Sequence, residues 1–154
     1  MNILCIGDIV GKPGREAVQK LLPQLVEEHK IDFVIANAEN AAGGAGILPK
    51  IAEELLGYGC DLLTTGDHIW DKKEIFDFLD KTPNVLRPLN FPHQTPGKGF
   101  FVAETKTGKK IAVINLLGRV FMRYNTNCPF EAVAEVLEEI KKETYIIVVD
   151  IHAE

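Results

Sequence analysis

Paired cysteines, long apolar runs and an excess of basic charge are all missing from this sequence. The three cysteines, Cys5, Cys60 and Cys128, lie far apart and form no C-x-x-C pair, so a disulfide framework is not indicated. Two of them fall in apolar runs that are typical of strands. We therefore interpret them as reduced thiols of the core of a cytoplasmic protein.

Two classes of membrane-directed segment are also missing. No apolar stretch reaches the roughly 18 residues that would predict a membrane span. The first ten residues, MNILCIGDIV, have no basic start and are broken by Gly7-Asp8, so they do not resemble a signal peptide. The sequence therefore predicts neither a membrane partner nor secretion.

The charge balance is mildly acidic. Lysine and arginine number 17 against 22 aspartates and glutamates, a net charge of −5. Such a balance does not indicate broad electrostatic binding to nucleic acid, and RNA would need a local basic patch. With 154 residues, 46% of them hydrophobic, the chain is long enough for a single domain with a buried core.

Apolar runs alternate with helical patterns through the first half of the chain. We expect strands at 2–7, 32–38 and 60–66, and helices at 15–29, 48–59 and 71–81. Pro23 should kink or restart the first helix. The alternation favours an α/β fold with a mainly parallel sheet and flanking helices.

After Pro83 the pattern changes. A loop rich in proline and glycine holds at most a short strand at 84–86. We then expect a β-hairpin over 100–117, a helix over 129–143 and a last buried strand over 144–152. No repeat or linker divides the chain, so residues 1–154 are predicted to form one domain.

Polar and ionisable residues follow the predicted strands. They are Asp8, Glu39-Asn40, Asp67-His68, Asn115, and the pair Asp150 and His152. Parallel strands bring their carboxyl ends to one rim of a sheet, where ligands bind. Carboxylates and imidazoles together suit divalent transition metals, and a carboxylate such as Glu39 could bridge two ions. The set therefore predicts a metal site.

Each of these residues also has an ordinary interpretation. Asp8 could cap the next turn, and Glu39-Asn40 could form a turn without chemistry. His68 and His152, taken singly, are more often packing or helix-start residues. Their recurrence at successive strand ends is what favours the metal site. A dinucleotide-binding fold is disfavoured because Asp8 stands where its first turn needs a glycine.

Six motifs together resemble a known family. GDIVGKPGR, ANAENAAGGAGI, TTGDHIWD, RPLNFP, NLLGRVFM and DIHAE occur in order and span essentially the whole chain. They resemble the YmdB-like branch of the calcineurin-like metallophosphoesterases. The resemblance implies a four-layer α/β/β/α sandwich and metal-dependent hydrolysis of phosphodiesters, cyclic nucleotides among them.

The resemblance also implies roles for individual residues. Asp8 would bind a first metal, Glu39 would bridge both metals, and Asp67 with His152 would bind the second. Asn40 would contact the substrate, and His68 would donate a proton to the leaving group. A metal-bound hydroxide would attack phosphorus, with Fe, Mn or Zn as the metals.

Two departures from the family pattern stand out. The family has Gly-Asn-His where this chain has Gly66-Asp67-His68. The added negative charge should hold a metal more tightly but lower its effect on water acidity, and so slow the chemistry. Family members also continue past DIHAE, through another half-sheet and a Gly-x-His-x-His motif that completes both metal sites.

We therefore expect the chain to be the N-terminal portion of a longer domain. A missing portion supplied in trans, or a second copy in a homo-oligomer, would complete the sheet. The alternative to a phosphodiesterase is a non-catalytic fragment that binds metal or nucleotide weakly and oligomerises.

Overall fold

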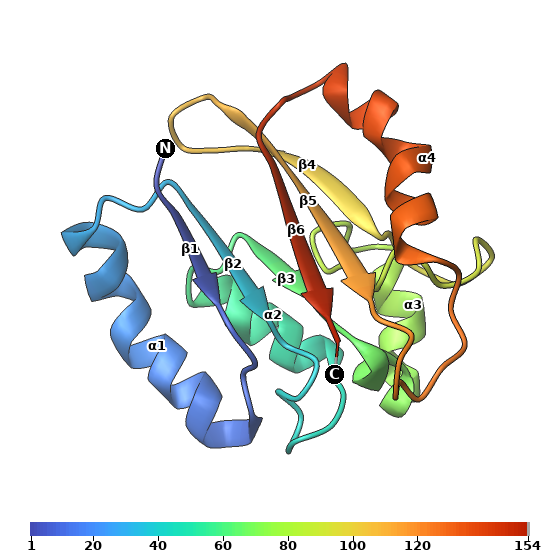
Figure 1. The fold of residues 1–154 in the computed structure, drawn as a ribbon. Coiled ribbons are helices and arrows are strands. Elements are labelled where there is room, and N and C mark those ends of the chain that lie inside the picture. Colours follow the sequence, from blue (N-terminus) through green and yellow to red (C-terminus); the bar gives the residue numbers. More distant parts are fainter. Residues whose placement is uncertain (154) are drawn as a thin grey trace.

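The computed structural model describes residues 1–153 and consists of two three-stranded sheets with helices on their outer sides (Figure 1). The first half of the chain contains β1 (Ile3–Ile6), α1 (Gly11–Glu28), β2 (Phe33–Asn37), α2 (Pro49–Gly57) and β3 (Leu62–Thr64). The second half contains the 3-10 turns η1 (Asp67–Asp71) and η2 (Lys73–Ile75), then α3 (Phe76–Leu79), β4 (Phe100–Glu104), β5 (Lys110–Leu117), α4 (Pro129–Lys141) and β6 (Ile147–His152).

The first sheet is entirely parallel, in the order β1-β2-β3. Each pair of neighbouring strands is joined by a helix, as parallel pairing requires. The central strand β2 is apolar on both faces, and Phe33, Val34, Ile35 and Ala36 are all buried. This explains why its sequence reads as a continuous apolar run instead of an alternating one.

The second sheet is mixed, in the order β4-β5-β6. β4 and β5 form the predicted antiparallel hairpin, which turns at Gly108 with a φ of 75°. β6 then pairs in parallel with β5 after the chain has crossed over through α4. Only β5, the middle strand, is buried along nearly its whole length.

Three clusters of buried side chains separate four layers. Between the sheets lie Phe33, Ile35 and Leu62 of the first sheet against Ile111 and Val113 of the second. The alternate β5 residues Ala112, Ile114 and Leu116 face α4, as the two-residue period of a strand requires. The third cluster packs α1 and α2 on the outer face of the first sheet. The predicted α/β/β/α sandwich is therefore confirmed.

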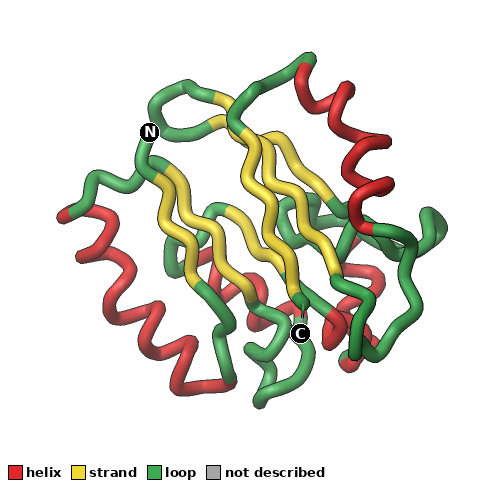
Figure 2. The backbone as a smooth tube through the Cα atoms, in the orientation of Figure 1, coloured by secondary structure: helices red, strands yellow, loops and turns green. Residues whose placement is uncertain are grey.

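All the strands except β4 run the same way. Their carboxyl ends lie at the edge where the chain reaches residue 152 (Figure 1), and Figure 2 shows loops gathered at that edge. The backbone ties these loops together, since Ile9 N donates to Asn37 O at 3.0 Å and Ala38 N donates to Thr64 O at 2.9 Å. These backbone hydrogen bonds therefore hold the first residues after the strands in fixed positions.

Several local predictions were wrong. The expected helix over 71–81 is broken into 3-10 turns and a four-residue α-helix, because Lys72 is extended with φ −118° and ψ 114°. The expected strand at 84–86 is only a pair of isolated bridges, one of them Leu63 to Val85. α1 begins at Gly11 instead of residue 15 and continues through Pro23.

The last strand starts later than expected, at residue 147 instead of 144, and it is partly exposed instead of buried. Thr144 instead turns the chain into β6, since its hydroxyl donates to Lys110 O and accepts from Ile146 N. Within residues 1–153, none of the helices has both the length and the apolar character needed to span a bilayer.

Candidate metal centre

Glu39, Asp67 and His152 converge at the carboxyl ends of the strands. Each offers one ligand atom, and these atoms lie within 4.8 Å of one another. Glu39 follows β2 and Asp67 follows β3, whereas His152 is the last residue of β6 in the other sheet. Residues as far apart in the sequence as Glu39 and His152 thus form one group of metal-binding type.

The chemistry of this group fits a cation. His152 Nδ1 lies 2.6 Å from Glu39 Oε1, yet Glu39 Oε1 is buried and accepts no hydrogen bond within the described chain. His152 Nε2 lies 3.5 Å from Asp67 Oδ1. Burial raises the pKa of Glu39, an effect opposed by the nearby His152. A metal ion would satisfy the orphaned oxygen and favour the ionised carboxylate.

Gly66 makes room for the Glu39 carboxylate. A Cβ atom built at Gly66 would collide with both carboxylate oxygens of Glu39. Glu39 is 0% exposed, so its carboxylate does not reach solvent. The sequence shows Gly66 within TTGDH, but its role cannot be inferred there because it depends on a contact with a distant strand.

Asp8 and Asn40 form a separate pair. Asn40 Nδ2 donates to both oxygens of Asp8, each at 3.0 Å, and thereby joins the ends of β1 and β2. Asn40 Oδ1 is buried and has no partner among the residues described. Asp8 is not in the cluster of three ligands, so the structure brings together only three of the four predicted metal ligands.

The two sheets are linked beneath the cluster. Thr64, at the end of β3, donates its buried hydroxyl to Asp150 of β6. Asn115 donates to Thr65 O at 2.9 Å and to Leu86 O at 3.2 Å. Asp150 and Asn115 were noted in the sequence only as polar residues near strand ends, and here they connect the sheets that carry Glu39, Asp67 and His152.

His68 lies beside the cluster and is held by a carboxylate. Its Nδ1 is 2.8 Å from Asp71 Oδ2, and its Nε2 is 3.9 Å from Asp67 Oδ1. The hydrogen bond to Asp71 raises the pKa of His68, although burial acts in the opposite direction. The backbone N–H of His68 also donates to Glu39 Oε2 at 3.3 Å.

Asp71 is the last residue of η1 and links two side chains. Its second oxygen accepts from Arg123 Nη1 at 2.6 Å, so Asp71 links Arg123 to His68. Burial tends to raise the pKa of Asp71, but the hydrogen bonds from His68 and Arg123 outweigh it and lower that pKa. No sequence signal connects Asp71 with Arg123, because the two are 52 residues apart in the chain.

Known proteins resemble this chain throughout its length. It is 49% identical to the 2',3'-cyclic-nucleotide 2'-phosphodiesterase of Bacillus subtilis, in an alignment that covers all of this chain and 58% of that protein. A protein of Thermus thermophilus, solved as a hypothetical protein, superimposes with a TM-score of 0.86 and is 38% identical, over 100% of this chain and 58% of that one.

A further solved structure, described as a novel phosphatase of Mycoplasma pneumoniae, gives a TM-score of 0.87 at 34% identity. The alignment covers 99% of this chain and 55% of that chain. The chain thus spans somewhat more than half the length of these relatives. The model of the YmdB-like protein family matches residues 4–154, and the chain belongs to that family.

Proposed function

We propose that this chain supplies part of the active site of a metal-dependent phosphodiesterase that acts on a cyclic nucleotide or a related phosphodiester. The observation that carries the proposal is the meeting of Glu39, Asp67 and His152 around a buried carboxylate oxygen without a hydrogen-bond partner in the described residues. The name of the Bacillus subtilis relative supports the substrate class.

Two transition-metal ions, Fe, Mn or Zn, fit the mixture of carboxylates and imidazole. Asp8 would hold the first, Glu39 would bridge both, and Asp67 with His152 would hold the second. Bound there, such ions lower the pKa of water and offset the charge on phosphoryl oxygens. The Asp8 side chain is exposed and already faces the site rim through Asn40, which supports its inclusion.

The chain's own polar groups would do the remaining work. Asn40 would position the substrate, since its buried Oδ1 is not engaged by any other described residue. His68 would donate a proton from Nε2 to the leaving oxygen. Asp71 supports this role because it occupies Nδ1, fixes the ring and favours its protonated form.

A further polypeptide would complete the site. The chain covers only 58% of the Bacillus subtilis relative, and β6 leaves Val149 and Ile151 exposed at 46% and 50%. Either a portion in trans or a second copy of the chain would cover them. The three cysteines are unpaired, which supports the cytoplasm as the compartment.

The rival function is a non-catalytic fragment that binds metal or nucleotide weakly and oligomerises. Metal content separates the two, measured by elemental analysis after dialysis of the chain and of the double variant Asp8→Asn/Glu39→Gln. The variant Glu27→Gln/Asp77→Asn, which alters two exposed carboxylates by the same change in charge, is the control.

We expect close to two metals per chain in the control and a loss of both in the site variant. Hydrolysis of a bis-aryl phosphodiester should then follow the metal content. A sub-stoichiometric metal content that is equal in all three proteins would reject the catalytic proposal in favour of the fragment.

A further inference from the structure

Arg123 is a cation beside the candidate metal centre that the proposed function does not use. Its Nη1 donates to Asp71 Oδ1 at 2.6 Å, and the other oxygen of that carboxylate lies 2.8 Å from His68 Nδ1. The hydrogen bond to Asp71 raises the pKa of Arg123, and the nearby charge of Asp67 adds to this effect. Arg123 is therefore one carboxylate away from His68 and near a candidate metal ligand.

The guanidinium of Arg123 is held in place from a second side. It lies over the ring of Tyr124, 5.5 Å from the ring centroid. Tyr124 packs edge-on against Phe91, and Phe91 packs edge-on against Trp70, each pair with ring centroids 5.6 Å apart. Trp70 precedes Asp71 in η1. A row of aromatic rings therefore joins the loop of Arg123 to η1 independently of the ion pair.

Most of the N–H groups of Arg123 are nevertheless open to a ligand. Within residues 1–153, its only hydrogen bond is the one from Nη1 to Asp71, and its side chain is 52% exposed. The donors on Nε and Nη2 remain, in a planar fork that matches the oxygens of a phosphate. A head group that is already ordered binds such an anion at a lower entropic cost.

The position of Arg123 favours a second phosphate of the substrate over the one that reacts. His68 Nε2, the proposed proton donor, lies 3.9 Å from Asp67 Oδ1, whereas Nδ1 faces Asp71. The two nitrogens point to different sides of the ring. The reacting phosphate would therefore lie on the Nε2 side, and Arg123 binds the carboxylate on the Nδ1 side.

A ribose would connect these two positions. When a 2',3'-cyclic phosphate opens, the leaving oxygen remains on the ribose, which also carries the 5' oxygen. A group on the 5' oxygen lies beyond the leaving oxygen, as Arg123 lies beyond His68. Building on the proposed function, we propose that Arg123 binds a phosphate at the 5' position of the substrate nucleotide. This phosphate is either a terminal monoester or the phosphodiester that links a preceding nucleotide.

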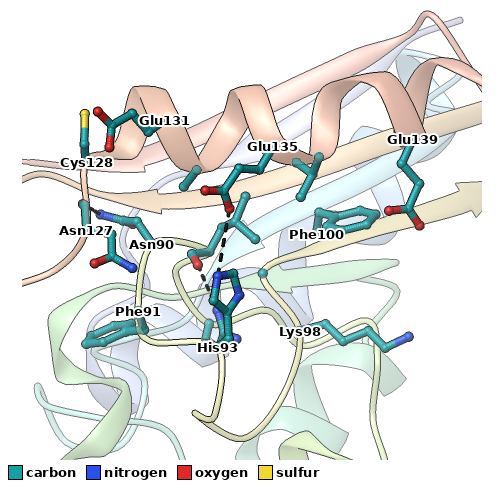
Figure 3. A pocket seen from close by; sticks show the side chains of 15 residues that line it. Asn90, Phe91, His93, Lys98, Phe100, Asn127, Cys128, Glu131, Glu135 and Glu139 are labelled. Atoms are coloured by element: carbon teal, nitrogen blue, oxygen red, sulfur yellow. Dashed lines mark hydrogen bonds and ion pairs between the residues drawn. The ribbon is translucent and has the colours of Figure 1, made fainter.

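The hollow beside α4 is not suited to such a phosphate. It has a volume of about 420 Å³, and Figure 3 shows Glu131, Glu135 and Glu139 of α4 along one side of it. Lys98, on the opposite side, offsets only one of these charges. The whole chain has a net charge of −5, so an added phosphate needs a dedicated cation such as Arg123.

Three probes test this assignment on the chain loaded with Zn²⁺, whose metal content is verified by elemental analysis. Adenosine 3'-phosphate has no 5' phosphate, adenosine 3',5'-bisphosphate has a 5' monoester, and the 3'-phosphorylated dinucleotide ApAp has a 5' phosphodiester. Calorimetry gives the three dissociation constants. We expect at least one of the last two probes to bind about tenfold more tightly than adenosine 3'-phosphate, as a hydrogen bond between charged groups allows. The probe with the larger gain identifies the kind of 5' phosphate.

Variants of two arginines in one loop locate this gain. Arg123→Gln should abolish it and leave the affinity for adenosine 3'-phosphate unchanged. A purely structural role through Asp71 would instead weaken all three probes alike, so the ratio of the dissociation constants separates the two roles. Arg119→Gln removes the same charge from an exposed residue of this loop and should retain the gain. Circular dichroism verifies that both variants are folded.

The outcomes distinguish this inference from the proposed function on which it rests. A chain that binds no metal overturns both. If the metal is bound, the assignment of Arg123 alone is overturned by a 5' phosphate that brings no gain, or by a gain that persists in Arg123→Gln. It is also overturned if Arg119→Gln loses the gain to the same extent.

Discussion

The two sheets contribute to the candidate metal centre in different ways. The first sheet supplies Glu39 and Asp67 from loops that backbone hydrogen bonds fix to one another, and both side chains are buried. The second sheet supplies only His152, from an edge strand that is half-exposed along its length. One half of the site is therefore built into a core, whereas the other half depends on how the two sheets are held together.

The largest expected effect comes from the first sheet. Gly66→Ala places a methyl group where the buried Glu39 carboxylate lies, so Glu39 must move or the backbone must shift. We expect bound metal, measured by elemental analysis, to fall to a background level.

Gly57→Ala is the matched control, because a Cβ at Gly57 meets nothing within 4 Å and the residue lies at the end of α2. Metal content should remain that of the parent chain. Equal metal in the two alanine variants would show that the first sheet is not the rigid half of the site.

An intermediate effect is expected from the link between the sheets. Thr64→Val removes the hydroxyl that donates to Asp150, so β6 and His152 are held less firmly. Mutation of a residue that hydrogen-bonds to a metal ligand and orients it typically lowers metal affinity by about 10–100-fold. We expect a weakening near the lower end of that range, measured by competition with a chelating dye.

Thr144→Val serves for comparison, since it deletes a similarly buried hydroxyl that bonds Lys110 O away from the site. It should reduce the free energy of unfolding by about 1 kcal/mol without changing metal affinity. If Thr144→Val weakens metal binding as much as Thr64→Val, the link beneath the cluster has no special role.

A smaller effect is expected at His68. Asp71→Asn replaces the carboxylate that stabilises the protonated imidazole, so the pKa of His68 should fall toward its ordinary value. The measurement is an NMR titration of the His68 ring protons in the metal-free chain. Asp77→Asn, which changes an exposed carboxylate of α3, should leave the titration curve in place.

The last comparison concerns two cysteines and does not involve metal binding. Burial raises the pKa of Cys60, next to β3, to about 12, so only about one thiol in 10⁴ is ionised at pH 8. Cys128, at the start of α4, is partly exposed. We expect iodoacetamide to label Cys128 more than tenfold faster, as mass spectrometry would show. Equal rates would mean that the segment before β3 opens as readily as the start of α4.

The sequence correctly predicted those features that depend on residues close together in the chain. Strand–helix alternation predicted the parallel sheet, the turn at Gly108 predicted the hairpin, and polar residues after apolar runs located Glu39 and Asp67. These signals depend on neighbours along the chain, and local propensity reports them well.

The rest depends on contacts between distant segments. The collision that makes Gly66 necessary, the bond between Thr64 and Asp150, and the link from Arg123 through Asp71 each join separate parts of the chain. The predicted helix at 71–81 failed for a related reason, since Asp71 is occupied by His68 and Arg123 and Lys72 is extended. The helical spacing of apolar residues in the sequence does not indicate such competing contacts.

One strand, β6, carries both His152 and the exposed side chains of Val149 and Ile151. It pairs only with β5 among the described strands, and an open, apolar strand edge is a template on which another chain can pair. A chain that paired there would cover the strand that carries His152. If copies of this chain pair along β6, the metal dissociation constant should depend on protein concentration, which a dilution series would show.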